Sequence, residues 1–119
     1  MGDAVVELRK GALDVLILKG LSWGHAHGYG ISRWIRETTD GALSVEEGAL
    51  YPALHRMELK GWIVPSWGLS DNGRRAKYYR MTAEGRRHLR AEATSWTRFA
   101  AAMAKVLAGT NPPSWARQT

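Results

Sequence analysis

The sequence predicts a mostly α-helical fold with a small β-hairpin: a winged helix-turn-helix followed by a long C-terminal helix. Three observations carry this prediction. Helical patterns separated by short turns fill the first half of the chain, a β-branched and aromatic hairpin pattern follows, and a long heptad pattern ends the chain. We expect a winged helix-turn-helix domain over residues 1–82, a dimerisation helix over residues 83–109 and a disordered tail over residues 110–119.

Two helices are predicted before the central one. Apolar residues keep helical spacing through residues 6–21, and Gly24 lies just beyond the end of this segment. Residues 22–28 form a turn in this interpretation, and residues 29–38 form a short second helix. Short connections between these helices and the next one are typical of a helix-turn-helix core.

The central helix is predicted over residues 44–61. One helical face carries the apolar residues Leu50, Leu54 and Met57. Ser44, with Glu47 three positions later, fits a capping box at the start of the helix, and Gly61 fits a C-terminal stop. Pro52 cannot donate a hydrogen bond to the Gly48 carbonyl. We therefore expect either a bend at this proline or a helix that begins later than Ser44.

A β-hairpin is predicted directly after the central helix. Residues 62–67 and 77–81 are β-branched and aromatic, and residues 69–73 between them are rich in turn formers. Pro65 predicts that the first strand lies at a sheet edge or carries a bulge. Basic residues follow the hairpin tip, so this hairpin has the character of a wing.

The last helix is predicted to begin at Thr82, with Glu84 in its first turn. A heptad seam runs along it through Leu89, Ala93, Trp96, Ala100, Met103 and Leu107. This apolar face is broader than a small winged core can cover, so we expect the helix to pair with a second copy of the chain. Packing of the same face against the chain's own first helix is the alternative.

The charge balance favours a polyanionic partner. Seventeen Lys and Arg residues against eleven Asp and Glu residues give a formal charge of +6 and a pI near 10.1. Nucleic acid is the first candidate, and an anionic membrane surface is the second. The absence of cysteine excludes disulfides and thiolate metal sites. Neither a signal peptide nor a membrane-spanning run is apparent, so we expect a cytoplasmic protein.

Catalytic and metal-binding patterns are missing. The four histidines do not stand at metal-ligand spacing, and the chain has neither a nucleophile elbow nor a glycine-rich phosphate loop after a strand. The sequence therefore predicts no enzyme activity, no metal site and no cofactor.

Double-stranded DNA is the partner that the residue pattern favours. On the central helix, small or flush residues permit close approach to the sugar-phosphate wall: Gly48, Ala49 and Pro52. Tyr51 and His55 can donate to a phosphate or a base edge, and Arg56 has the geometry for a bidentate contact with guanine. The alternatives for Arg56 are a position that merely flanks the DNA, or an ion pair with Glu58 or Glu37. Wing contacts to phosphate are expected from Arg74, Arg75 and Lys77.

Four segments stand out together: His-Gly-Tyr-Gly-Ile at residues 27–31, Glu-Gly-Ala-Leu-Tyr-Pro-Ala-Leu-His-Arg-Met-Glu at residues 47–58, Gly-Trp-Ile at residues 61–63 and Arg-Ala-Lys-Tyr-Tyr-Arg-Met-Thr-Ala-Glu-Gly at residues 75–85. Through these segments the chain resembles the PadR family of winged-helix transcriptional regulators. These segments have the order and spacing of the family and cover most of residues 8–90. In length the chain is similar to the compact subgroup, which has a single C-terminal dimerisation helix.

The resemblance implies a homodimeric regulator, usually a repressor, that binds a near-palindromic operator. It implies that the region around Tyr51 and Pro52 enters the major groove and that the wing flanks it. Tyr29, within the first family motif, is a further candidate for DNA contact. Members of the family commonly respond to small aromatic or drug-like molecules, which in the compact subgroup can bind between subunits beside a tryptophan of the last helix. Trp96 is the corresponding candidate here, with plain interface packing as the alternative. A helical protein-interaction module without specific DNA binding is the rival function, and a membrane-surface protein is a further one.

Overall fold

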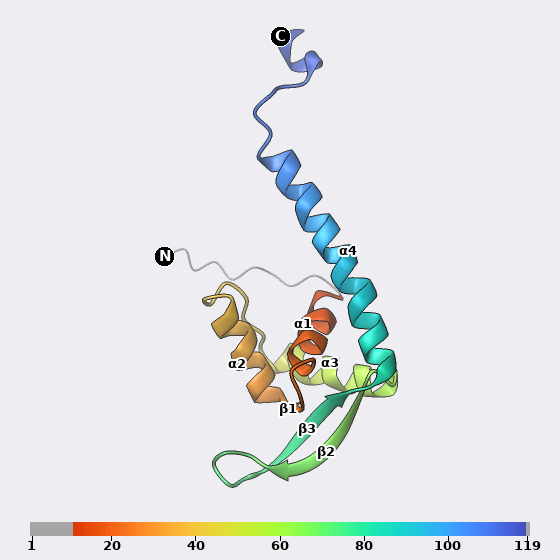
Figure 1. The fold of residues 1–119 in the computed structure, drawn as a ribbon. Helices are drawn as coiled ribbons and strands as arrows, with labels where there is room; N and C mark the ends of the chain where they lie inside the picture. Colours follow the sequence, from red (N-terminus) through yellow and green to blue (C-terminus); the bar gives the residue numbers. More distant parts are fainter. Residues whose placement is uncertain (1–10, 119) are drawn as a thin grey trace.

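The computed structural model describes residues 11–118, and Figure 1 shows their arrangement. The elements are α1 (Ala12–Leu21), β1 (Ala26–His27), α2 (Gly28–Thr38), α3 (Glu47–Leu59), β2 (Ile63–Leu69), β3 (Arg75–Met81), α4 (Ala83–Leu107) and a short 3₁₀ helix (Ser114–Gln118). Helices α1 to α3 pack together, the β2–β3 hairpin extends from one side of them, and α4 rises away from the body (Figure 1). The predicted class, a winged helix-turn-helix with a long C-terminal helix, is confirmed.

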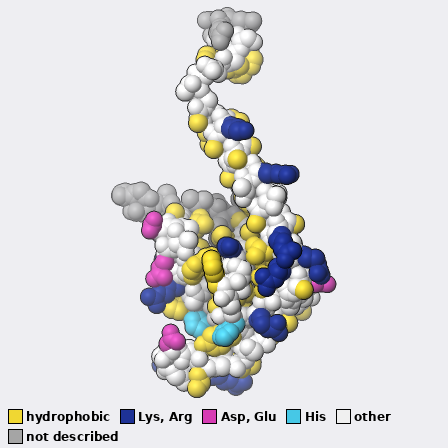
Figure 2. Space-filling view, viewed as in Figure 1, with side chains coloured by type: hydrophobic (Ala, Val, Ile, Leu, Met, Phe, Trp, Pro, Cys, Tyr) yellow, Lys and Arg dark blue, Asp and Glu magenta, His cyan; other side chains and the backbone are white. Residues whose placement is uncertain are grey.

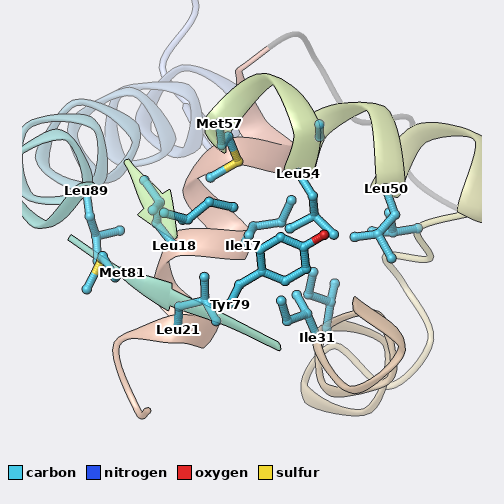
Figure 3. Close-up of a cluster of buried hydrophobic side chains, with 14 residues drawn as sticks. Ile17, Leu18, Leu21, Ile31, Leu50, Leu54, Met57, Tyr79, Met81 and Leu89 are labelled. Carbon is cyan, nitrogen blue, oxygen red and sulfur yellow. The ribbon is translucent and has the colours of Figure 1, made fainter. Parts of the chain in front are cut away.

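The core joins all of the longer elements. Ile17 and Leu18 of α1 and Leu54 and Met57 of α3 have no measurable exposure to solvent. Figure 3 shows these side chains meeting Tyr79 and Met81 of β3 and Leu89 of α4. Apolar burial of this kind is the dominant stabilising term in a small domain, and here it fixes α3 relative to the wing.

The first two helices begin at different residues from those predicted. Helix α1 begins at Ala12, because Gly11 has a left-handed conformation with φ 88°. The earlier part of the predicted segment lies outside the described residues. Helix α2 begins at Gly28, since the Nδ1 atom of His27 accepts a hydrogen bond of 2.9 Å from the Gly30 N–H and so caps the helix.

The predicted capping box at the start of α3 is wrong. The helix begins at Glu47, the capping residue is Glu46, and no side chain caps it. The preceding Val45 is buried in the core, and the Ser32 hydroxyl donates to the Val45 carbonyl at 3.4 Å. These contacts hold the chain in an extended form, so the helix starts later than Ser44. Pro52 lies inside α3.

The predicted stop at Gly61 is confirmed. Gly61 has φ 77°, and its N–H donates to the Glu58 carbonyl at 3.0 Å. The Trp62 N–H donates to the Met57 carbonyl at 3.1 Å. This pair of bonds is a Schellman motif, and it turns the chain from α3 directly into β2.

The sheet has three antiparallel strands in the order β1-β3-β2. Strand β2 pairs with β3 from Ile63 opposite Met81 to Leu69 opposite Arg75. Pro65 lies on β2, which is an edge strand, as predicted. Strand β1 pairs with β3 as well. The sequence prediction missed β1 and assigned its two residues to a turn.

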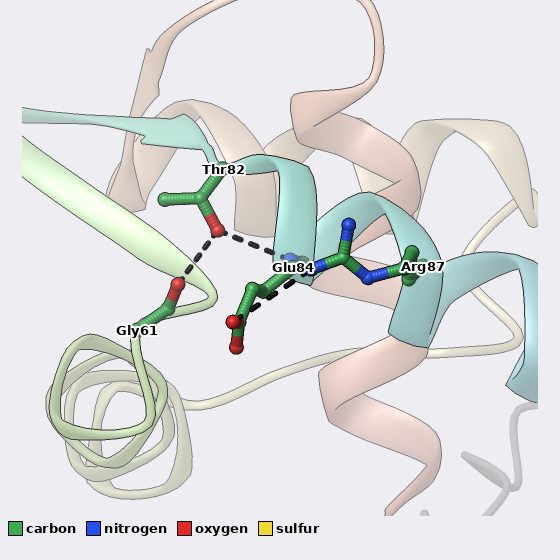
Figure 4. A network of polar contacts seen from close by, with 5 residues as sticks. Gly61, Thr82, Glu84 and Arg87 are labelled. Atoms are coloured by element: carbon green, nitrogen blue, oxygen red, sulfur yellow. Dashed lines mark hydrogen bonds and ion pairs between the residues drawn. The ribbon is translucent and has the colours of Figure 1, made fainter.

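The start of α4 is tied to the end of α3. The Thr82 hydroxyl accepts from the Gly85 N–H at 3.1 Å, which confirms Thr82 as the cap, and donates to the Gly61 carbonyl at 2.6 Å. Figure 4 shows this network together with the Glu84–Arg87 ion pair of 3.7 Å. Of these bonds, the one from Thr82 to Gly61 joins α4 to the body and so helps to fix the direction in which α4 leaves it. Beyond α4, the tail contains the 3₁₀ helix, where the prediction expected no regular structure.

Candidate nucleic-acid interface

A hollow of about 1050 Å³ separates the wing from α2 and α3. Helix α2 contributes Tyr29 and Arg33 to its lining, and helix α3 contributes Tyr51, His55 and Glu58. The wing side of the lining includes Arg74, Arg75 and Lys77. The fold thus gathers aromatic, imidazole and basic groups from three separate segments on one surface.

The two tyrosines of this hollow are exposed. Tyr29 is 61% exposed and Tyr51 is 46% exposed, although both belong to elements that bury apolar side chains nearby. Tyr51 packs beside Gly28, where an added Cβ atom would lie 3.0 Å from its ring. A glycine at this position therefore lets α2 and α3 approach closely and brings the two tyrosines onto one face.

The predicted contact residues of α3 divide into two groups. Tyr51 and His55 line the hollow, together with Tyr29 and the three basic wing residues. Gly48, Ala49 and Pro52 are exposed on α3 but do not line the hollow. A Cβ atom on Gly48 would meet nothing within 4 Å, so the surface there is open to a large partner.

Arg56 has a different neighbour from the ones predicted. Its guanidinium donates to the Asp14 carboxylate of α1, and neither Glu58 nor Glu37 pairs with it. The Asp14 side chain is 9% exposed and the Arg56 side chain is 47% exposed. Arg56 does not line the hollow. In the structure it therefore ties α3 to α1.

Lys77 is also paired. Its ammonium donates to a Glu58 carboxylate oxygen at 3.1 Å, and this hydrogen bond raises the pKa of Lys77 above its ordinary value. Burial raises the pKa of the neighbouring Tyr79 phenol. The bond joins the wing to α3, so much of the Lys77 charge is already neutralised at the edge of the hollow.

Strand β1 and the preceding His25 pack against the middle of the wing. The rings of His25 and His27 each lie with their centroids 5.3 Å from the Tyr78 ring centroid. The Tyr78 hydroxyl in turn donates to the Leu69 carbonyl at 2.8 Å. These contacts connect the start of α2 to the hairpin, so the two sides of the hollow are held together.

Three residues of this region escaped the sequence prediction. Arg33 lines the hollow and pairs with Glu37 at 3.1 Å, a spacing of four residues that was visible in the sequence. Asp14 interrupts the apolar run of α1, which is a signal for a buried ion pair. Trp67 lies under Arg75 on the wing, and only the strand register reveals that neighbourhood.

The predicted seam of α4 changes character along the helix. Leu89 is buried in the core of its own chain, and Ala93 packs against that core, so Leu89 is not available to a second chain. Trp96 is half-buried, with its ring edge-on to Phe99 at a centroid distance of 6.1 Å. Farther out, Ala100 is exposed, Met103 is 41% exposed and Leu107 is 76% exposed. Figure 2 shows hydrophobic side chains along this projecting part.

Residues 11–118 contain no group of three or more His, Cys, Asp or Glu side chains arranged to hold a metal ion. No helix within the same residues is long and apolar enough to cross a membrane.

The three-helix core, the hairpin and the hollow between them define a winged-helix protein. A family model described as the transcriptional regulator PadR-like family matches residues 17–91. The chain belongs to this family, as its motifs predicted, and is a transcriptional regulator of the PadR family.

Individual relatives agree with this assignment. An uncharacterised protein of Lysinibacillus sphaericus is 34% identical over 91 residues, which cover 76% of this chain and 83% of that protein. A transcriptional regulator from Clostridium thermocellum is 33% identical with a TM-score of 0.72, over 81% of this chain and 93% of its own. A PadR-like transcriptional regulator from Bacillus cereus is 30% identical with a TM-score of 0.73, over 85% and 96% of the two chains.

Proposed function

We propose that this regulator binds duplex DNA sequence-specifically as a homodimer and represses transcription by occupying a promoter. The observation that carries the proposal is the hollow, which brings Tyr29, Tyr51 and His55 together with Arg74 and Arg75 of the wing. Exposed hydroxyl and imidazole groups suit base edges and phosphates, and the wing arginines suit the phosphate backbone. Such a regulator acts on the chromosome, so a cytoplasmic location belongs to the proposal.

The projecting part of α4 supports the dimer. Met103 and Leu107 lie exposed on one face there, beyond the reach of the chain's own core. Burying such a face against a second copy of α4 removes apolar area from water. The two α3 helices of the dimer would then meet half-sites about 10 bp, or a small multiple of that distance, apart.

Release by a ligand is the third part of the proposal. Trp96 is half-buried and flanked edge-on by Phe99, at the point where α4 leaves the core. A small aromatic effector stacked beside Trp96 between the subunits would change the spacing of the two α3 helices. A screen of small aromatic compounds should quench tryptophan fluorescence in the wild type and not in Trp96→Phe. Equal quenching in both proteins would leave Trp96 as interface packing alone.

DNA binding is tested by selecting bound fragments from genomic DNA and measuring their affinity against salt. Affinity should fall steeply between about 50 and 200 mM salt, because bound phosphates release counterions. Tyr51→Ala should weaken binding while leaving the fold intact, since the side chain is half-exposed and lies at the edge of the core. Unchanged affinity in Tyr51→Ala would mean that Tyr51 does not contact DNA.

The second candidate function is a helical interaction module that binds a partner protein through α4. The exposed apolar face of the projecting helix favours it. Salt-insensitive or absent duplex binding would support this candidate over the first. Met103→Lys tests whether α4 pairs with a second copy of itself. A homodimeric regulator of the proposed kind should become monomeric in analytical ultracentrifugation when this residue is charged. A dimer that persists in this variant would contradict pairing through the outer seam.

A further inference from the structure

The wing carries a tryptophan whose exposure the core does not explain. Trp67 is 58% exposed on β2. Residues opposite one another in a sheet share a face, and Trp67 stands opposite Lys77 while Leu69 stands opposite Arg75. Farther back on the same face, Ile63 and Tyr79 are buried. The face that fills the core at the base of the wing therefore continues, toward the tip, beside the hollow.

The two cations on this face have different partners. Lys77, nearer the core, is neutralised by Glu58. Arg75, nearer the tip, has its guanidinium carbon 4.4 Å from the centroid of the Trp67 ring, and no acidic side chain of residues 11–118 pairs with it. The contact with Trp67 fixes the guanidinium group without cancelling its charge. Because the ring covers one flat side only, the N–H groups at the edge remain able to bind a phosphate.

We infer that Trp67 is a positioning residue for DNA binding, which holds the Arg75 guanidinium toward a phosphate at the rim of the hollow. The inference rests on the proposed function. A free arginine side chain loses rotamer freedom when it binds, and a stacked one has lost part of that freedom beforehand. The wing thus presents a preorganised cation at Arg75, whereas Arg74 beside it is exposed and has no aromatic ring of residues 11–118 against it.

The salt dependence of binding separates positioning from direct contact. Each neutralised phosphate contributes about 0.9 to the slope of log affinity against log salt concentration. Arg75→Ala should lower both the affinity and the slope, the latter by about one contact. Trp67→Leu should weaken the affinity about 2–5-fold, the equivalent of the ~0.5–1 kcal/mol of an exposed cation–π contact. Its slope should stay unchanged, because the arginine still reaches the phosphate.

The experiment is a double-mutant cycle on a duplex fragment selected from genomic DNA. In the Arg75→Ala background, adding Trp67→Leu should cost nothing further, since Trp67 acts through Arg75. Trp67→Phe should recover part of the wild-type affinity. Trp23→Leu is the matched control: Trp23 is also exposed and also has a cation over its ring, Lys19 at 5.1 Å, but Lys19 does not line the hollow, whereas Arg75 does. This control should bind as the wild type does.

Three results would overturn the inference. An equal loss from Trp67→Leu with and without Arg75 would mean that Trp67 contacts DNA itself. Wild-type affinity in Trp67→Leu would mean that the stack has no effect on binding. A loss in Trp67→Leu accompanied by a lower melting temperature and no recovery in Trp67→Phe would make the role structural. A wild-type protein that binds no duplex would instead refute the proposed function, and this inference with it.

Discussion

The ion pair between Asp14 of α1 and Arg56 of α3 provides the sharpest test of what fixes α3 against α1. Arg56→Met keeps the aliphatic stem and removes the guanidinium, leaving the Asp14 carboxylate buried without its partner. Breaking a fully buried pair costs about 3–5 kcal/mol, and an exposed pair contributes about 0–1 kcal/mol. Arg56 is 47% exposed, so the pair lies between these limits. We expect Arg56→Met to lower the free energy of unfolding by about 1–2 kcal/mol.

Urea unfolding of a double-mutant cycle measures the interaction itself. Asp14→Leu should also destabilise the protein, and Asp14→Leu combined with Arg56→Met should recover much of the loss, because no charge is then left unpaired. We expect a coupling energy of about 1–2 kcal/mol. Strictly additive costs, with coupling below about 0.3 kcal/mol, would refute the conclusion that this pair ties α3 to α1.

The same variant separates the two roles of Arg56 in DNA binding. If Arg56 acts only by holding α3, Arg56→Met should weaken binding to all operator variants by a similar factor. A bidentate contact with guanine would instead produce a loss of specificity at one base position, of about 1–3 kcal/mol. Affinities for a set of single-base operator variants decide between these outcomes.

Two further predictions concern stability. In Gly85→Ala the new Cβ would lie 2.2 Å from the Trp62 carbonyl oxygen, and a backbone atom cannot move aside as a side chain can; we expect a loss of about 1–3 kcal/mol in urea unfolding. Gly48→Ala is the matched helical glycine with open space, so its stability should be unchanged or higher by up to about 1 kcal/mol, and a loss as large as that of Gly85→Ala would contradict the packing described here. At high pH, the raised pKa values of Lys77 and Tyr79 mean that the folded state holds these protons more tightly than the unfolded chain does. The contribution of these two groups to the free energy of unfolding should therefore be fully present below about pH 10, and it should be lost as the pH rises through their folded-state pKa values. Glu58→Gln should lessen the part of this loss that is due to Lys77. A pH profile of unfolding that is identical in the wild type and Glu58→Gln would rule out the Lys77 contribution.

Local signals predicted most of the fold. The apolar spacing of Leu50, Leu54 and Met57 depends only on helical geometry, and all three side chains are buried as expected. Gly61 and Thr82 are end signals whose chemistry acts within a few residues, and both predictions are confirmed. Such features could be read from the sequence because the interactions that produce them are short-range.

The errors arose where distant contacts override local preference. The capping box at Ser44 was chemically sound, but burial of Val45 holds that stretch extended. Strand β1 is two residues long and exists because β3 lies beside it, so no local pattern could reveal it. Arg56 had two candidate partners nearby in sequence or on a neighbouring helix, whereas its actual partner lies 42 residues away on α1.

The hollow between the wing, α2 and α3 likewise combines features that local sequence predicts with features that depend on distant contacts. Tyr51, His55, Arg74 and Arg75, chosen for residue type and position, and Tyr29, taken from the family resemblance, line one hollow, and their contact with DNA stays a prediction. The pairing of Lys77 with Glu58 and the stacking of Arg75 on Trp67 depend on strand register and on the packing of α3 against the wing. A uniform heptad pattern likewise concealed that Leu89 belongs to the chain's own core while Met103 does not.

Hydroxyl-radical footprinting on a fragment selected from genomic DNA tests the central claim most directly, because it reports protein contact and its geometry in one measurement. A homodimer that presents two α3 helices and two wings should protect two segments related by a near-palindrome, with centres about 10 bp or a small multiple apart. Met103→Lys should abolish this paired pattern. A single protected segment, or paired protection that survives in Met103→Lys, would contradict a dimer built through the outer part of α4.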